Sequence, residues 1–195
     1  IETATDICGI ALIDNGTCVK KIEKQIPRKH AEQLPLFYET LINSSIYNKL
    51  KTDAVAVSIG PGSFTGLRVG LGFAKGLAYA KDLPIIPVPT LYALAMSSKF
   101  NEGSVLLYSH RDIVYIQDFE ANKTINNPKA TEWKNIDHSK QIFHYGCEKL
   151  FIKEKYRKLI PSAQAVGELA YTNHKEWIVN KPYDLVPNYI SPFEI

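Results

Sequence analysis

The residues best suited to chemistry form a glycine-rich string, Gly60-Pro61-Gly62-Ser63-Phe64-Thr65-Gly66, between an apolar run and a segment with helical periodicity. A loop that leads into a helix N-terminus presents backbone amides, and the helix dipole favours an anion there. The string lacks both the Gly-Lys-Ser/Thr of a Walker loop and the G-x-S-x-G spacing of a nucleophile elbow. A rigid structural turn therefore explains it at least as well as a phosphate site. The candidate anion-binding residues are Gly60, Gly62, Ser63 and Thr65.

Metal and nucleophile signatures are weak. The five histidines show no HxxxH or HExxH spacing, and no two of the three cysteines form a CxxC pair. We expect no metal site and no catalytic residue in this chain. The cysteine usage is typical of a reducing compartment, and we expect a cytoplasmic protein.

A basic stretch interleaved with aromatic residues follows Cys147. Such a stretch can hold RNA phosphates while its rings stack on bases. It also contains Glu148 and Glu154, and a solvated charged face is the common alternative. The candidate tRNA contacts are Lys153, Lys155, Arg157 and Lys158.

Four glycines fall inside one expected helix, at 66, 70, 72 and 76. A glycine in a helix interior costs about 1 kcal/mol relative to alanine, so these residues need a compensating gain. Each pair four residues apart, Gly66/Gly70 and Gly72/Gly76, leaves a flat strip where another backbone can approach closely. The strips pack either on the protein's own sheet or on a partner helix, and both can hold on different faces.

The elements that position these residues read as an α/β protein. An Asp14-Asn15-Gly16 turn predicts a hairpin, and apolar runs predict buried strands. The expected strands cover 7–13, 17–26, 54–59, 83–88, 105–108 and 114–119, and the expected helices 31–42, 65–80, 90–97, 148–151 and 162–173. Pro35 is expected in the first turn of the first helix or at its true start. The residue pattern changes near Lys99, which divides the chain into a first lobe, 1–98, and a smaller second lobe, 99–195. Within the second lobe, 122–139 is polar and loop-rich.

Length and composition exclude several classes of protein. The chain has 195 residues, 45% hydrophobic and 22% charged, with a formal net charge of +3. It is therefore expected to fold, and its charge alone does not indicate nucleic-acid binding. No apolar run is long enough to cross a bilayer, and there is no secretory signal at the start. Ile1 already belongs to an apolar strand pattern, so we expect that the natural N-terminus lies upstream.

Three stretches carry a resemblance to a known family: Ile1-Glu2-Thr3-Ala4-Thr5, the string from Ser58 through Gly70, and Ala74-Lys75-Gly76-Leu77-Ala78. They resemble the TsaB (YeaZ) family. The resemblance implies an actin-like, sugar-kinase-like ATPase fold of the ribonuclease H-like type, with two lobes and central mixed sheets. It implies a degenerate second lobe and a non-catalytic subunit that acts with TsaD and TsaE. That assembly transfers a threonylcarbamoyl group to the adenosine 3′ of the anticodon (t6A) in tRNAs that read codons beginning with adenine.

The resemblance also implies where the partner binds. TsaD is expected to pair with the two helices of the first lobe, TsaE to join the assembly, and tRNA to be reached through the complex. ATP and metal are expected in the partner subunits, with none bound by this chain alone. Leu34→Glu or Gly70→Leu is expected to weaken the pairing while leaving the fold largely intact. The expected interface residues are Ala31, Leu34, Phe37, Tyr38, Leu41, Gly66, Val69, Gly70, Phe73 and Leu77.

Two alternatives remain open. One is an enzyme of the same fold, either a metal-dependent peptidase or a small-molecule kinase. The missing histidine pair argues against the first, and the scarcity of glycine after Gly76 argues against the second. The other is a self-associating scaffold, because the same helical face could form a homodimer in isolation.

Overall fold

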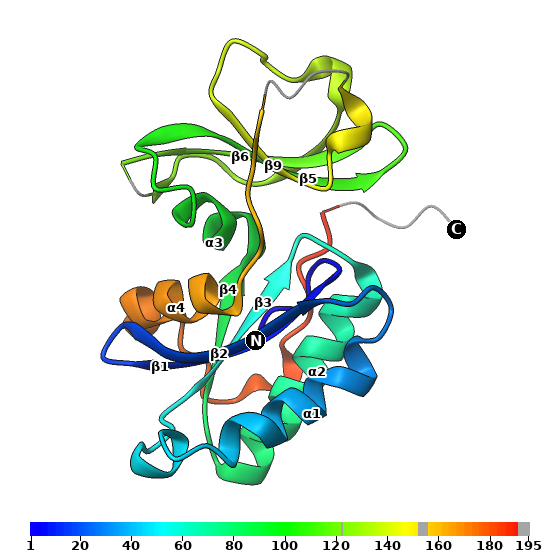
Figure 1. Ribbon diagram of the computed structural model, residues 1–195. Helices are drawn as coiled ribbons and strands as arrows, with labels where there is room; N and C mark the ends of the chain where they lie inside the picture. The colour runs from blue at the N-terminus through cyan, green and yellow to red at the C-terminus, as the bar shows by residue number, and fades with distance from the viewer. Residues whose placement is uncertain (122, 152–155, 191–195) are drawn as a thin grey trace.

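The chain forms two lobes, one above the other in Figure 1, in the computed structural model, which describes residues 1–121, 123–151 and 156–190. The strands are β1 (Ile7–Asp14), β2 (Thr17–Gln25), β3 (Val55–Gly60), β4 (Ile85–Pro89), β5 (Glu102–His110), β6 (Ile113–Glu120), β7 (Lys123–Thr124), β8 (Lys129–Glu132), β9 (Ile142–Tyr145) and β10 (Arg157–Lys158). The α-helices are α1 (His30–Ile42), α2 (Phe64–Lys81), α3 (Thr90–Met96) and α4 (Ala163–Trp177). Short 3-10 turns cover Tyr47–Lys49, Trp133–Asn135, Glu148–Leu150 and Pro182–Asp184.

Residues Ile1 and Glu2 join the two strand pairs of the first lobe. β1 and β2 form an antiparallel hairpin, while β3 and β4 are parallel. Glu2 exchanges both backbone hydrogen bonds with Gly9 of β1 at 2.9 Å. On its other side Ile1 donates to the carbonyl of Ala56 at 2.8 Å and accepts from the amide of Ser58 at 3.0 Å. The result is one mixed arrangement in the order β2, β1, Ile1–Glu2, β3, β4.

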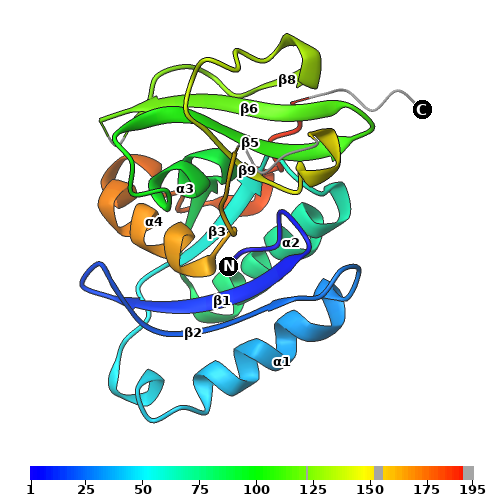
Figure 2. The same ribbon diagram turned by 45° about the horizontal axis from the view of Figure 1, so that its top comes forward.

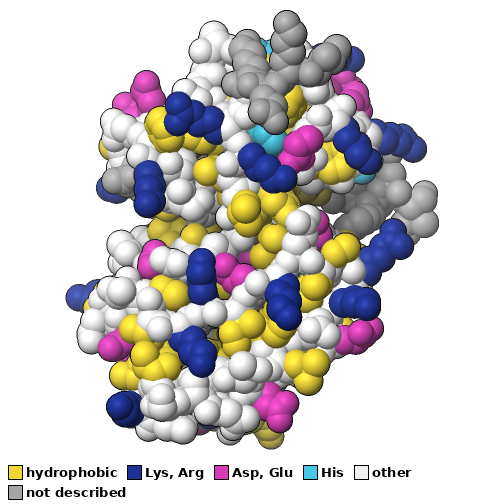
Figure 3. Space-filling view, in the orientation of Figure 1, with side chains coloured by type: hydrophobic (Ala, Val, Ile, Leu, Met, Phe, Trp, Pro, Cys, Tyr) yellow, Lys and Arg dark blue, Asp and Glu magenta, His cyan; other side chains and the backbone are white. Residues whose placement is uncertain are grey.

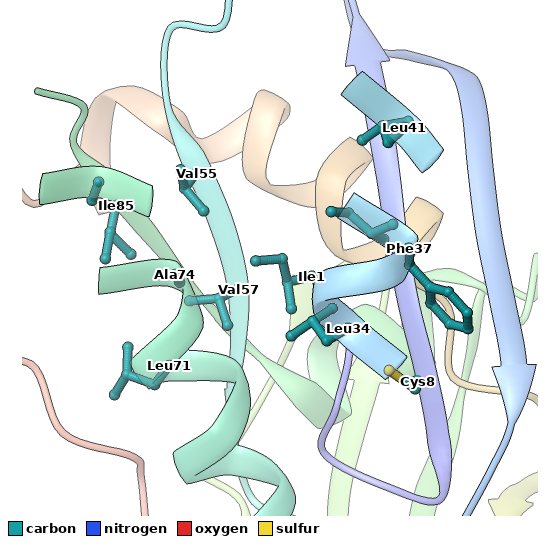
Figure 4. Packing of buried hydrophobic residues seen from close by; sticks show 12 residues of the cluster. Ile1, Cys8, Leu34, Phe37, Leu41, Val55, Val57, Leu71, Ala74 and Ile85 are labelled. Atoms are coloured by element: carbon teal, nitrogen blue, oxygen red, sulfur yellow. The ribbon is translucent and has the colours of Figure 1, made fainter. Parts of the chain in front are cut away.

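Helices cover both faces of these strands. α1 and α2 lie on one face and α4 on the other, with the strands between them (Figure 2). Side chains alternate accordingly, because successive residues of a strand point to opposite faces. Ile85 packs with the α1 and α2 side chains, and its neighbour Ile86 packs with those of α4. Figure 4 shows Ile1 between Val57 of β3 and Leu34 of α1, at the centre of the first core.

The second lobe is a six-stranded mixed sheet in the order β10, β9, β5, β6, β7, with β8 also pairing with β6. β5 pairs antiparallel with β6 and parallel with β9. Its inner face packs on α3 and on Ile7 of β1, so the lobes share a buried cluster. The expected polar stretch 122–139 contains the short strands β7 and β8 among its loops.

The expected division at residues 98 and 99 is wrong for the last part of the chain. α4 packs on β1, β2, β3 and β4, and Val179 forms a bridge with Ile85 of β4. Further on, the amide of Asn188 donates to the carbonyl of Ile59 at 2.7 Å. The chain therefore returns to the first lobe after β10. Sequence periodicity detected α4 without indicating which sheet it covers.

Glu23 of β2 fixes this return. One of its carboxylate oxygens accepts from the hydroxyl of Ser162 at 2.6 Å and from the amide of Ala163 at 2.7 Å. Ser162 in turn caps α4 by accepting from the amide of Gln164. A carboxylate at a helix N-terminus is stabilised by the unsatisfied amides and by the helix dipole.

Pro35 lies inside α1 rather than in its first turn, which corrects a second expectation. Its position is exposed, while Leu34, Phe37 and Leu41 on the opposite side are buried. The missing hydrogen bond of a proline is expensive in a helix interior. Burial of three large apolar side chains, each worth about 1.5–3 kcal/mol, offsets that cost.

The glycines of α2 divide between two faces. A Cβ at Gly66 would lie 2.1 Å from the carbonyl oxygen of Thr3, and one at Gly70 would lie 2.1 Å from the Thr3 hydroxyl oxygen. By contrast, a Cβ at Gly72 or Gly76 meets no described atom within 4 Å. Gly66 and Gly70 thus serve the protein's own packing, and Gly72 and Gly76 face outward.

This division predicts opposite effects for the same substitution. Gly66→Ala should lower the free energy of unfolding by about 1–3 kcal/mol, because its methyl group meets a backbone oxygen. Gly72→Ala and Gly76→Ala should each raise it by up to about 1 kcal/mol through helix propensity. Urea denaturation of the three variants measures the difference. Equal effects at all three positions would contradict the assignment of faces.

Candidate functional site

A cleft with a volume of about 1880 Å³ lies between the lobes. From the first lobe it is lined by residues 4–6, by the turn between β2 and α1, and by the loop before α2. From the second lobe it is lined by the β5–β6 turn, β8 and the end of β9. Three candidate anion-binding residues, Gly62, Ser63 and Thr65, line this cleft, while Gly60 does not. One candidate RNA contact, Lys158, also lines it.

A hydrogen-bonded carboxylate joins the lobes at the cleft. The Tyr145 hydroxyl of β9 donates to Asp6 Oδ1 at 2.5 Å, and the Gln25 side-chain amide donates to Asp6 Oδ2 at 2.7 Å. Burial, together with the hydrogen bond to Asp6, raises the pKa of Tyr145. The phenol therefore stays protonated and remains a donor that holds the two lobes together.

The glycine-rich loop uses most of its groups internally. The Gly60 amide donates to the Thr90 hydroxyl at 3.0 Å, and the Ser63 amide donates to the Ala4 carbonyl at 2.6 Å. The Ser63 hydroxyl accepts from the Gly66 amide at 3.2 Å and so caps α2. A Cβ at Gly62 would lie 2.3 Å from the Ala4 carbonyl oxygen. The loop is thus built as a close-packed turn, and three amides that could hold a phosphate are already engaged.

The β5–β6 turn on the opposite wall of the cleft is not suited to bind a phosphate either. Its tip is Arg111, a side-chain-bearing residue at φ 52°, where a phosphate-binding turn relies on glycine to let backbone amides approach. The cleft wall mixes cations with carboxylates, including Arg28, Arg111, Glu132 and Glu148. The residues present do not fit a nucleotide phosphate held in the manner of an actin-like ATPase.

Glu2 is 1% exposed. Its carboxylate accepts from the Ala4 amide at 2.6 Å, which holds the bend between residues 2 and 5. Burial raises the pKa of Glu2 from 4.5 to about 7, although its hydrogen bonds act in the opposite direction. The role of the Glu2 carboxylate is therefore structural, because it holds this backbone bend. The described residues contain no group of three or more His, Cys, Asp or Glu side chains that could hold a metal ion.

Two of the four candidate RNA contacts of the basic stretch lie among the described residues. Lys153 and Lys155 lie outside the described residues. Arg157 stacks over the Phe100 ring at 4.3 Å, and Lys158 pairs with Glu148 at 2.7 Å. Both described cations are exposed, and each already has a partner within the second lobe.

Half of the expected interface residues are wrong because they belong to the core. Leu34, Phe37 and Leu41 are at most 5% exposed, and Gly66 and Gly70 are closed by Thr3. Leu34→Glu and Gly70→Leu would therefore disrupt the first lobe itself. The remaining expected residues lie at the surface, with Ala31 exposed and Tyr38, Val69, Phe73 and Leu77 half-buried.

The outward strip between α1 and α2 contains residues that the expected interface left out. Among the described residues, a Cβ at Gly72 or Gly76 of α2 would meet open space, and Tyr79 of the same helix is 77% exposed. On α1, Leu36 is 51% exposed. Tyr38 meets Phe73 edge to face at 5.8 Å and closes the space between the helices. The four-residue spacing of Gly72 and Gly76 is the sequence signal that marks this strip.

Comparisons with known proteins identify the family. A family model described as "TsaD: tRNA N6-adenosine threonylcarbamoyltransferase" matches residues 21–141, more than half of the chain. The tRNA threonylcarbamoyladenosine biosynthesis protein TsaB of Bacillus subtilis is 30% identical over 97% of this chain and 92% of its own length. The chain belongs to the TsaB family.

Other relatives agree over shorter regions. TsaB of Haemophilus influenzae is 41% identical over 50% of this chain, and that of Escherichia coli is 36% identical over 53%. The chain spans less than half the length of these two relatives, 41% and 45% respectively. A Pseudomonas aeruginosa structure described as similar to peptidase YeaZ covers 97% of both chains with a TM-score of 0.78 at 22% identity. The expected actin-like fold is thus confirmed. No helix in the described part of this TsaB-family chain could cross a membrane.

Removing the phenol that joins the lobes should weaken the structure measurably. Tyr145→Phe deletes a hydrogen bond to a carboxylate, and such bonds contribute about 1.5–3 kcal/mol. We expect a loss of free energy of unfolding of that size in urea denaturation. Tyr183 is 65% exposed, so Tyr183→Phe is the matched control and should change little. An unchanged midpoint for Tyr145→Phe would show that the lobes are held by other contacts.

The raised pKa of Glu2 predicts a pH-dependent stability. Because the folded state binds the proton more tightly than the unfolded state, this group lowers the free energy of unfolding as pH rises from 4.5 to about 7. The fall should reach at most about 3 kcal/mol and then level off. Glu2→Gln cannot ionise and should lack it. The measurement is the stability difference between wild type and variant at pH 5 and pH 8, with exposed Glu32→Gln as control. A difference independent of pH would contradict the assignment.

Proposed function

We propose that this chain is a subunit of the machinery that forms N6-threonylcarbamoyladenosine in tRNA. The observation that carries the proposal is the match to a TsaB protein over 97% of the chain. Its reaction is the transfer of a threonylcarbamoyl group to the adenosine 3′ of the anticodon, in tRNAs reading codons that begin with adenine. The chain would act in the cytoplasm with a TsaD protein and a TsaE protein.

Within that assembly the chain is proposed to be non-catalytic. Three amides of its glycine-rich loop are engaged in the fold, and the Glu2 carboxylate holds a backbone bend. The second-lobe turn ends in Arg111 rather than glycine. These features favour a structural role over the peptidase-like or kinase-like alternative. ATP and metal then belong to the partner subunits.

The partner surface is proposed to be the outward strip between α1 and α2. Its floor at Gly72 and Gly76 is open, so a helix backbone can approach α2 closely there. Tyr38, Phe73 and Leu77 are half-buried and offer apolar surface along its length. A homologous helix pair of TsaD fits this shape, because two such pairs form a four-helix interface. A second copy of this chain is the competing occupant.

An omission assay tests the proposed function. TsaD, TsaE, a source of threonylcarbamoyl-adenylate and unmodified tRNA are combined with and without this chain, and the modified nucleoside is quantified. We expect product only with the complete set and none with this chain alone. Equal product without the chain would refute the role. Product with the chain alone would refute its non-catalytic assignment.

Variants of Gly76 test the surface separately. Gly76→Leu fills the strip and should abolish co-elution with TsaD, together with product formation, while its unfolding midpoint stays near that of wild type. Gly76→Ala adds one methyl group and should weaken pairing less. Thr172→Leu on the exposed side of α4 is the control and should leave pairing unchanged. Full pairing of Gly76→Leu would exclude the strip. Loss of a self-association seen in the wild type, with TsaD pairing intact, would assign the strip to a homodimer.

A further inference from the structure

The net charge of the chain is concentrated in one short segment. Residues 20–29 contain five of the 23 Lys and Arg residues and one of the 20 Asp and Glu residues. The other 185 residues therefore carry 18 cations against 19 carboxylates, which makes them almost neutral. The members of this basic row are Lys20, Lys21, Lys24, Arg28 and Lys29.

The basic row lies along the outer edge of the first-lobe strands. β2 pairs with β1 alone among the described strands, so its other edge faces outward. Lys20 and Lys24 share one side of β2, because residues two and four apart in a strand point the same way. Arg28 and Lys29 continue the row in the turn before α1, and both are exposed. In Figure 3 several Lys and Arg side chains spread over this part of the surface.

Most of this charge is not neutralised within the protein. Lys21 pairs with Glu23 at 3.1 Å, but Lys20, Lys24, Arg28 and Lys29 form no ion pair with any residue that the structure describes. The carboxylate of Glu23 is also committed to the hydroxyl and amide at the start of α4. Lys24 also lies over the Phe37 ring at 5.9 Å, but no described carboxylate neutralises it, so all four cations can still meet an external anion.

We propose that the basic row binds the sugar-phosphate backbone of RNA. Lys20 to Gln25 are extended and span roughly 20 Å, and Arg28 and Lys29 follow in the turn, so the row can contact more than one phosphate. Lysine and arginine on such a track supply the sequence-independent part of nucleic-acid affinity. The choice of RNA over other polyanions rests on the proposed function, because the substrate of that assembly is tRNA.

The row also leads to the cleft. Gln25, Pro27 and Arg28 line its first-lobe wall, and Arg111 lies on the opposite wall. RNA held along β2 would therefore pass the cleft mouth, on a different surface from the glycine strip of α2. Binding of RNA and pairing with a partner through α2 can occur together.

Direct binding tests the row with the full chain. Fluorescently labelled unmodified tRNA is titrated with protein at several salt concentrations, and anisotropy gives the affinity. The test variant combines Lys24→Gln, Arg28→Gln and Lys29→Gln. The control combines Lys129→Gln, Lys175→Gln and Lys181→Gln, three exposed cations elsewhere, so both variants lose the same net charge. Thermal melts establish that both are folded.

We expect the test variant to bind tRNA at least tenfold more weakly at low salt than the control. Each phosphate contact contributes about 0.7–0.9 to the slope of log affinity against log salt, so this slope should fall by about 2–3. Equal affinities for the two variants would overturn the proposal, since charge alone would then explain binding. Poly-glutamate binding to the row without tRNA binding would overturn it in favour of an acidic protein partner. Aggregation of the test variant with wild-type tRNA affinity would assign the lysines to edge protection instead.

This outcome is separable from the proposed function. The omission assay asks whether the chain is needed for the modified nucleoside, whereas the anisotropy titration asks where RNA touches it. A chain that is required for product but shows equal binding by both variants would keep its function and lose the RNA surface. Selective loss of tRNA binding in a chain that is dispensable for product would show the reverse.

Discussion

The first lobe depends on how closely the backbone of Thr3 and Ala4 approaches α2. A Cβ at Gly62 would lie 2.3 Å from the Ala4 carbonyl oxygen and one at Gly66 would lie 2.1 Å from the Thr3 carbonyl oxygen, so only glycine fits at either position. This approach places Ile1 and Glu2 between β1 and β3, where they join two strand pairs into one arrangement. The same approach sets the floor of the cleft, because residues 4–6 line it. Fold and cleft therefore share one steric requirement.

That requirement changes the meaning of the glycine-rich string. Glycines before a helix commonly indicate a phosphate loop, since amides there can reach an anion. In this chain the glycines make room for a neighbouring segment, and the amides of Gly60 and Ser63 bond to Thr90 and Ala4. A glycine-rich motif can thus identify a family because the fold requires it for packing, without binding a phosphate. The chemistry of the assembly then needs another subunit, as proposed above.

Local signals predicted the elements well, and long-range contacts decided the rest. The Asn15-Gly16 turn, the apolar run of β3 and the periodicity of α1 are contained in short stretches, so hairpin, strand and helix could be predicted from the sequence. The buried side of α2 could not, because it depends on Thr3, more than 60 positions away. Likewise, the packing of α4 depends on Glu23 contacting Ala163, 140 residues apart. Local periodicity does not show these distant contacts for α1 either, so the sequence alone places Leu34 at the surface although it belongs to the core.

The two glycine pairs of α2 finally separate what the fold needs from what it does not. Gly66 and Gly70 recover their helix-propensity cost, because they allow the approach of Thr3. Gly72 and Gly76 recover nothing inside the described chain, yet together they lower helix stability by about 2 kcal/mol. A loss of that size is a large part of the net stability of a domain. The partner helix proposed to dock on the open strip would compensate for this loss. The four glycines of α2 thus differ in role: Gly66 and Gly70 serve an interior contact, while Gly72 and Gly76 are left for the proposed exterior one.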